Sequence, residues 1–76
     1  MKRTVNHTLE QTIEAWGAMV YRIALAYCGN AHDASDVFQN TFLKRHLHSG
    51  TFTDADHEKA WLIRVAINCS NDILRQ

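Results

Sequence analysis

The last third of the chain, residues 54–76, repeats its apolar side chains at the three- and four-residue spacing of an α-helix. At about 100° per residue, these side chains gather on one broad side of such a helix. They are Leu62, Ile63, Ala66, Ile67, Cys69, Ser70, Ile73 and Leu74. A helix with one apolar side is stable only when other elements cover that side. The sequence therefore predicts a helix over 54–75 that packs on a core supplied by the rest of the chain.

Two earlier segments show the same periodicity. The first, 8–28, begins with Thr8 and Gln11 at capping-box spacing and ends before Gly29, which suits left-handed backbone. The second, 31–48, follows Asn30, a favourable helix cap. The side chains expected to face inward are Leu9, Ile13, Trp16, Val20, Ile23 and Tyr27, then Ala34, Val37, Phe38, Thr41, Phe42 and Leu47. Thr53 and Asp56 have the spacing of a further capping box before the last helix.

Composition supports the same architecture. The chain of 76 residues has no proline and only three glycines, and 46% of its residues are apolar. This length suits one domain, and this apolar content is that of a folded protein. The predicted fold is all-α, a single compact bundle of three main helices.

The charge balance limits how such a chain can bind nucleic acid. Eight basic residues offset eight acidic ones, for a formal net charge of zero. A protein that holds duplex DNA by neutralising its phosphates normally carries a basic excess. Any binding of DNA by this chain should therefore need a partner that supplies the attraction, or a strand that is already open.

Catalytic and cofactor sites are not expected. The sequence has no paired nucleophile and base, no phosphate-binding glycine loop and no metal-ligand spacing. His46 and His48, two residues apart, would point away from each other on a helix. Cys28 and Cys69 lie in apolar helical settings and are expected to be buried, reduced thiols. No segment is long and apolar enough to cross a bilayer, so the expected location is the cytoplasm.

Two polar surfaces are candidates for binding. On the last helix, opposite the apolar side, five residues form a stripe: Trp61, Arg64, Asn68, Asn71 and Arg75. Aromatic, guanidinium and amide groups in a row can stack on bases and hold phosphates, although they also suit a solvated helix face. On the outer side of the second helix lie Asp33, Asp36, Gln39, Asn40 and Leu43.

Each polar segment also has a purely structural interpretation. The acidic residues of the second helix lie in its first turns, where the helix dipole favours negative charge. Lys44, Arg45, His46 and His48 form a basic run that suits a solvated helix end, or contact with a DNA backbone. Phe52 can pack as a hydrophobic staple before the last helix.

Three motifs resemble one family in the same order and spacing. Residues 60–68, AWLIRVAIN, resemble the promoter-melting helix of extracytoplasmic-function RNA polymerase sigma factors. Residues 21–42 resemble the two preceding helices of the same sigma domain. The resemblance implies that Asp36, Gln39 and Asn40, with Asp33 and Leu43 beside them, dock on the β′ clamp helices of core RNA polymerase. Ser35 departs from the acidic residue that is usual there.

The resemblance also implies a site for promoter DNA. In the family, the loop before the last helix and the start of that helix capture an unpaired base of the non-template strand at the minus-ten element. Phe52, Arg64, Val65 and Asn68 fall on those positions, and Trp61, Asn71 and Arg75 continue the surface. The family also implies a possible anti-sigma factor as a partner.

Two other functions stay open at this point. Three helices, the last bearing arginine and asparagine, also suit a helix-turn-helix protein that binds duplex DNA by itself. A protein-interaction module without DNA contact is the second alternative. The family's separate domain for the minus-thirty-five element is absent from these 76 residues. The expectation is therefore a fragment of a longer protein rather than a natural stand-alone one.

Overall fold

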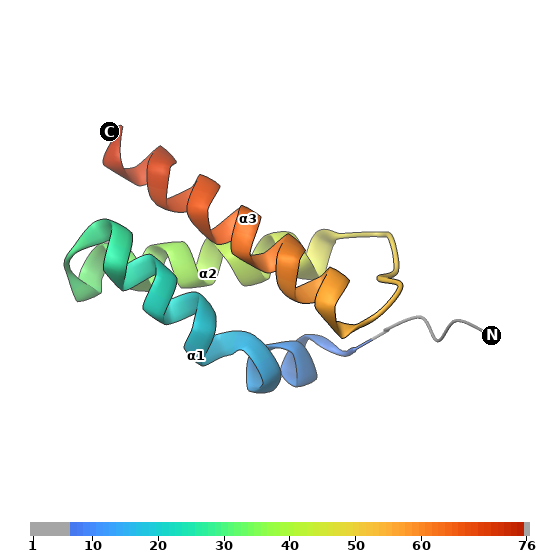
Figure 1. Ribbon diagram of the computed structural model, residues 1–76. Coiled ribbons are helices and arrows are strands. Elements are labelled where there is room, and N and C mark those ends of the chain that lie inside the picture. Colours follow the sequence, from blue (N-terminus) through green and yellow to red (C-terminus); the bar gives the residue numbers. More distant parts are fainter. Residues whose placement is uncertain (1–6, 76) are drawn as a thin grey trace.

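The computed structural model describes residues 7–75, which form three α-helices (Figure 1). They are α1 (Leu9–Cys28), α2 (Ala31–Leu47) and α3 (Ala55–Leu74). Every predicted helix boundary lies within one residue of the observed one. The all-α prediction and the three-helix bundle are confirmed. No helix within 7–75 is long and apolar enough to cross a membrane.

The first two helices are bounded by the caps that the sequence predicts. Thr8 and Gln11 form the capping box at the start of α1. Gly29 takes a left-handed conformation with φ 77°, and its N–H donates to the carbonyl of Leu25 at 2.8 Å. The Asn30 side chain accepts a hydrogen bond from the N–H of Asp33 at 2.9 Å. The chain therefore reverses tightly between α1 and α2.

The predicted Thr53–Asp56 capping box is wrong. Asp54 is the N-cap of α3, and its carboxylate accepts the N–H of His57 at 2.8 Å. The N–H of Thr53 instead donates to Nδ1 of His57 at 3.1 Å. The imidazole of His57 thus holds the residue before the cap, and the helix begins one residue later than the capping-box spacing suggests.

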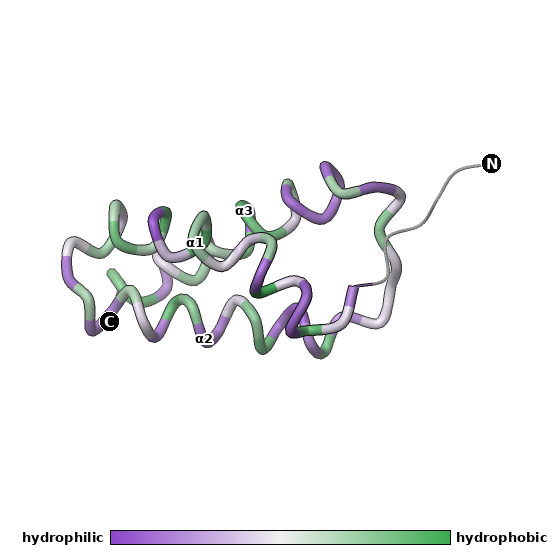
Figure 2. The backbone as a smooth tube through the Cα atoms, turned by 90° about the horizontal axis from the view of Figure 1, so that it is seen from below, coloured by the Kyte–Doolittle hydropathy of each residue, from purple (hydrophilic) through white to green (hydrophobic). Residues whose placement is uncertain are grey.

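Successive helices run in opposite directions alongside one another (Figure 1). In the view of Figure 2, α2 lies along one side of the molecule, with α1 and the beginning of α3 on the other, and α3 slants so that its C-terminal end lies toward α2. Two adjoining groups of buried residues fill the centre. One contains Val20, Phe42, Leu62 and Ala66, and the other contains Ala24, Ala34, Val37 and Cys69. Each group draws on all three helices.

Three of the side chains expected in the core are exposed. Tyr27 is 44% exposed, Leu47 70% and Leu74 53%. Each lies in the last turn of its helix. A helical wheel assumes neighbours along the whole length of a helix, and these neighbours are missing at the ends. Cys69 is buried as expected, whereas Cys28 is only half-buried, and both are free thiols.

Candidate nucleic-acid and protein interface

A carboxylate lies inside the bundle at the end where α3 begins. Glu58, in the first turn of α3, is 0% exposed. Its Oε1 accepts the indole N–H of Trp16 at 2.8 Å and lies 2.9 Å from Nδ1 of His7. Its Oε2 accepts Nη2–H of Arg45 at 3.0 Å and Nε–H at 3.3 Å, and lies 3.5 Å from the hydroxyl of Thr12. We call His7, Thr12, Trp16, Arg45 and Glu58 the Glu58 network.

The Glu58 network corrects the interpretation of the basic run. Arg45 is not part of a solvated helix end, because it is buried and paired with Glu58. Lys44 and His46 are exposed as expected. Both members of the pair fall on the inward sides of their helices, Arg45 one turn after Phe42 and Glu58 one turn before Leu62. Two opposite charges at inward positions were the sequence signal for this ion pair.

The network keeps Glu58 ionised. Burial by itself would raise the pKa of the Glu58 carboxyl, since it penalises the charged form. The hydrogen bonds from His7, Trp16 and Arg45 outweigh burial and hold that pKa below its ordinary value. The carboxylate therefore carries its charge at neutral pH and ties together α1, α2, α3 and His7, the residue before the N-cap of α1.

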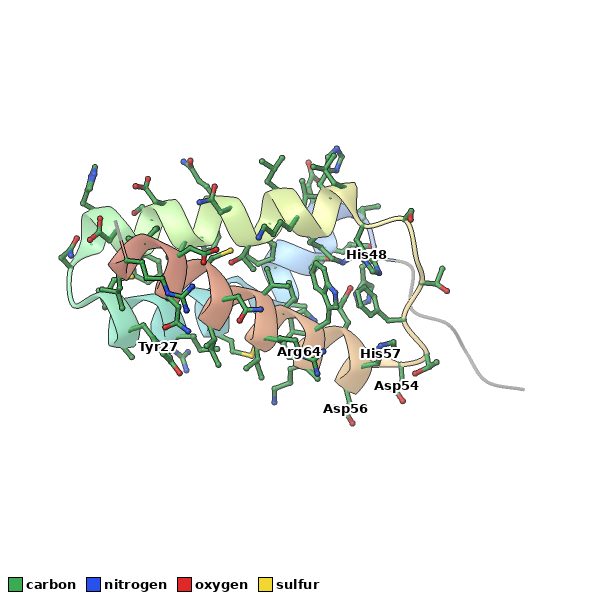
Figure 3. All side chains as sticks on the ribbon, turned by 90° about the horizontal axis from the view of Figure 1, so that it is seen from above. Tyr27, His48, Asp54, Asp56, His57 and Arg64 are labelled. Carbon is green, nitrogen blue, oxygen red and sulfur yellow. The ribbon has the colours of Figure 1, made fainter. Side chains whose placement is uncertain are left out.

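Phe52 lies beside the network and is enclosed by four side chains. The guanidinium of Arg45 lies 4.9 Å from the centre of its ring. His48 stacks on it at 5.0 Å and 16°, His57 meets it edge-on at 5.1 Å, and Trp61 lies 5.7 Å away. Figure 3 shows His48 and His57 at this end of the molecule, beside the loop between α2 and α3. We call these five residues the Phe52 cluster.

The burial of Phe52 bears on its predicted role at the DNA surface. Its ring is only 1% exposed, so a base cannot reach it in this conformation. Its ring packs on α3 through His57 and Trp61. Phe52 lies two residues before the N-cap Asp54, however, so it is not the hydrophobic staple that the Thr53 cap predicted. Val65, another predicted contact, is half-buried against the core group that contains Ala24 and Cys69.

The stripe of α3 is exposed at three of its five residues, while Trp61 packs against the core group that contains Phe42 and Leu62. Arg64, Asn68 and Arg75 are exposed, and Trp61 and Asn71 are half-buried. Arg75 lies 3.9 Å from Asp72, a contact between two exposed groups. Within residues 7–75, the side chains of Arg64, Asn68 and Asn71 have no hydrogen-bond partner in the protein. Their donors and acceptors are therefore free to meet a ligand. Figure 3 labels Arg64 among the side chains of α3.

The outer face of α2 presents the other predicted set. Asp36, Gln39, Asn40 and Leu43 are all exposed, and Leu43 is one of the large apolar side chains left uncovered. Asp33 is half-buried, and its carboxylate accepts a hydrogen bond from the side-chain amide of the N-cap Asn30 at 3.0 Å, so it helps to hold the cap in place. We call these five residues the α2 face. The two predicted surfaces therefore lie on different helices, the α2 face on α2 and the stripe on α3 and its C-cap Arg75.

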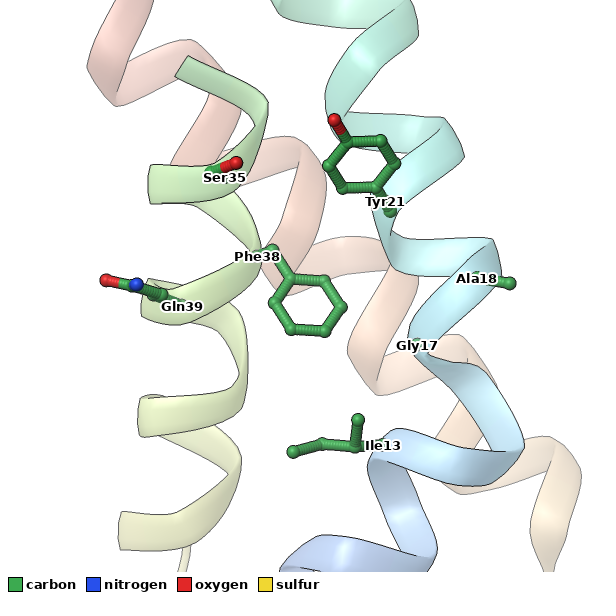
Figure 4. A pocket seen from close by; sticks show the side chains of 7 residues that line it. All are labelled: Ile13, Gly17, Ala18, Tyr21, Ser35, Phe38 and Gln39. Carbon is green, nitrogen blue, oxygen red and sulfur yellow. The ribbon is translucent and has the colours of Figure 1, made fainter. Parts of the chain in front are cut away.

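A shallow cavity of about 670 Å³ borders the α2 face on the side of α1. In Figure 4 the ring of Phe38 points toward Gly17 on α1, while Gln39 points outward. A second hollow of about 300 Å³, lined by Leu43, Leu47 and Ile73 among others, borders the face on the side of α3.

One group of described side chains is close enough to share a metal ion. Donor atoms of His32, Asp33 and Asp36 lie within 4.8 Å of one another near the start of α2. Asp33 already accepts the Asn30 amide, and His32 and Asp36 are exposed and 4.0 Å apart. Their arrangement is that of a solvated helix start.

The chain matches the family "Sigma-70 region 2" over residues 12–76. It is 30% identical over 69 residues to "ECF RNA polymerase sigma factor SigM" of Bacillus subtilis, covering 91% of this chain and 42% of the relative. It is 25% identical over 64 residues to "ECF RNA polymerase sigma factor SigW" of the same organism, covering 84% and 34%. A third relative is "ECF RNA polymerase sigma factor SigE" of Mycolicibacterium smegmatis, 36% identical over 62 residues, covering 75% and 22%.

The chain thus spans less than half the length of each of these relatives. No solved structure matches it significantly. The family match covers α1 from Thr12 onward, all of α2 and α3, both polar surfaces and the loop between them. This protein therefore belongs to the sigma-70 region 2 family.

Proposed function

We propose that this chain docks on core RNA polymerase through the α2 face and captures the unpaired non-template strand of the minus-ten element through the stripe of α3. The observation that carries the proposal is the stripe itself. Arg64 and Asn68 project from a helix whose opposite side is packed in the core, with no partner among the described residues. A guanidinium can hold a phosphate, and an amide can bond to a base edge.

The charges of the two surfaces support different partners for each. Only Arg64 and Arg75 supply positive charge along the stripe, which is too little to hold duplex DNA by phosphate neutralisation. Docking on the polymerase would bring the stripe to a strand that is already open. The acidic and amide groups of the α2 face, around the exposed Leu43, suit a protein partner. The role is binding without a catalytic step, in the cytoplasm with the polymerase.

Two alternatives make different predictions. A helix-turn-helix protein would shift duplex DNA without polymerase, in a strongly salt-dependent way. A pure interaction module, holding the polymerase or an anti-sigma factor, would keep every activity after the loss of Arg64 and Asn68. The zero net charge argues against the first alternative, and the unpaired polar groups of the stripe argue against the second.

The docking half of the proposal is tested by binding to bacterial core RNA polymerase. An Asp36→Arg, Gln39→Ala variant should lose binding, because both side chains are exposed on the α2 face. Glu14→Arg, a matched charge reversal at an exposed position of α1, should bind normally. Equal binding by all three proteins would remove the α2 face from the proposal.

The DNA half is tested with single-stranded oligonucleotides. An Arg64→Ala, Asn68→Ala variant should keep its helical circular dichroism and its binding to polymerase, yet lose most of its strand binding. Lys59→Ala removes a positive charge from the same helix away from the stripe and should leave strand binding intact. Unchanged strand binding in the double variant would leave the interaction module as the better account.

A further inference from the structure

The imidazole of His48 is the loosest member of the Phe52 cluster. Arg45 is fixed by Glu58, and Nδ1 of His57 accepts the N–H of Thr53. The ring of His48 has no hydrogen bond within the described residues. It is held by stacking on Phe52, at 5.0 Å and 16°, and by contact with Trp61 at 4.9 Å. Of the three ionisable side chains around Phe52, which are Arg45, His48 and His57, His48 is thus the one whose departure breaks no hydrogen bond of its side chain.

We propose that His48 is a replaceable cover, and that an unpaired base takes the place of its imidazole on Phe52 beside Trp61. This inference rests on the proposed capture of single-stranded DNA. An imidazole stacked nearly parallel to an aromatic ring has the geometry that a nucleobase adopts on such a ring. Trp61 also begins the stripe, so a base at this place would continue directly to Arg64, one turn further along α3. The cover explains how a buried Phe52 can belong to a DNA surface.

The loop leaves room for the covering position. A Cβ added at Gly50 would lie 3.0 Å from Nε2 of His48 and 3.6 Å from its Cε1. Among residues 7–75, Gly29 is the glycine with a positive φ, so the backbone at Gly50 tolerates an L side chain. A methyl group at Gly50 would therefore push the imidazole without straining the loop. This position offers a way to disturb the cover while His48 itself stays in place.

Loss of the His48 ring should raise the affinity for single-stranded DNA. In the free protein the imidazole competes with the base for the same aromatic surface, and its contacts are lost when the base enters. Removing the ring should therefore strengthen strand binding, by about three- to tenfold for one stacking contact. A residue that only supported the fold would have the opposite effect, because damage to the fold weakens binding.

The affinity test uses the 76-residue chain and a fluorescein-labelled pool of random single-stranded 12-mers, followed by anisotropy at low salt. His48→Ala should bind about three- to tenfold more tightly than the wild-type chain, and Gly50→Ala should shift in the same direction. His46→Ala, which removes an exposed imidazole two residues away, should not change the affinity. Unchanged or weaker binding by His48→Ala would overturn the cover.

Proton NMR of the imidazole gives a second test, which is made on the wild-type chain and uses His48→Ala only to assign the signals. The ring protons of His48, assigned by their loss in His48→Ala, should be shifted by the aromatic rings of Phe52 and Trp61 in the free protein. Saturation with the oligonucleotide pool should move them to the positions of a solvent-exposed histidine. Signals that stay in place while the strand binds would overturn the cover.

The two proposals can fail separately. If the Arg64→Ala, Asn68→Ala variant loses strand binding while His48→Ala leaves it unchanged, the cover is wrong and the stripe stands. If the wild-type chain shows no binding that depends on Arg64 and Asn68, the proposed capture of DNA fails, and the cover fails with it.

Discussion

Glu58 is the residue on which the packing of the bundle's loop end depends. A buried carboxylate is costly unless donors surround it, and here donors come from α1, from α2 and from His7, the residue before the N-cap of α1. Such a pair contributes less through its own attraction than through the damage that follows when one partner is lost. Arg45 would then be left buried with its charge uncompensated.

Replacing Glu58 by glutamine should lower the free energy of unfolding by about 3 kcal/mol, because Arg45 loses its counter-charge while the shape of the side chain is kept. Urea denaturation followed by circular dichroism measures the change. Glu14→Gln, an exposed position on α1, should change stability by less than about 0.5 kcal/mol. Similar stabilities for the two variants would show that the pairing of Arg45 with Glu58 contributes nothing to the free energy of unfolding.

The same residue should make the fold sensitive to acid. Its folded-state pKa lies below the ordinary value of 4.5, so the unfolded chain binds the proton more readily. Stability therefore rises with pH through this range. The contribution of Glu58 is complete above about pH 4.5 and is lost as the pH falls toward the folded-state pKa. Denaturation curves between pH 7 and 3 should show this loss in the wild-type chain and a smaller one in Glu58→Gln.

At the level of the helices, local sequence signals determined nearly all of the fold. The periodicity of apolar residues located the three helices. As expected, α1 begins after Thr8 and ends before Gly29, and α2 begins after Asn30. The start of α3 was misplaced because Thr53 and Asp54 are both good caps, and only the contact with His57 distinguishes them. Tyr27, Leu47 and Leu74 were misplaced because periodicity does not tell where a neighbouring helix stops.

The candidate site was less predictable than the fold. The stripe and the α2 face each follow from spacing on a single helix, and most of their residues are exposed. The Glu58 network and the Phe52 cluster join residues from different elements, such as Arg45 with Glu58 and His48 with Trp61. Such contacts depend on how the helices cross, which a wheel for each helix does not contain.

The start of α3 gives a test at this scale. Asp54→Ala should destabilise the domain by about 1 kcal/mol, because the first amides of the helix lose their side-chain acceptor. Thr53→Ala should cost less, since its N–H contact with His57 comes from the backbone and survives the substitution. Thermal unfolding of the two variants compares them. A larger destabilisation by Thr53→Ala than by Asp54→Ala would support Thr53 as the cap, as the capping-box spacing suggested.

At the scale of the whole molecule, the α2 face and the stripe occupy different helices while the net charge is zero. Under the proposed function, the chain would engage a protein and a nucleic acid at once without a strong field of either sign. Long-range attraction to DNA would come from the polymerase, and this domain would supply short-range contacts. That division makes a quantitative prediction about salt.

Strand binding should depend only weakly on salt. If Arg64 and Arg75 each neutralise one phosphate, the logarithm of the association constant should fall with that of the salt concentration at a slope of about −1.4. Arg64→Ala should reduce the slope to about −0.7. Anisotropy titrations at salt concentrations from roughly 50 to 300 mM measure the slope for the wild-type chain and for Arg64→Ala. A much steeper slope would favour the duplex-binding alternative.

The Glu58 network also bears on how the domain unfolds. One carboxylate receives hydrogen bonds from segments that lie 51, 42 and 13 residues away along the chain. Detaching any one of them uncovers a charge or a buried donor, so a state with two helices in place and one released is penalised. Cooperativity in so short a chain then comes from a shared polar centre as well as from the apolar core. The domain should lose all three helices in a single transition.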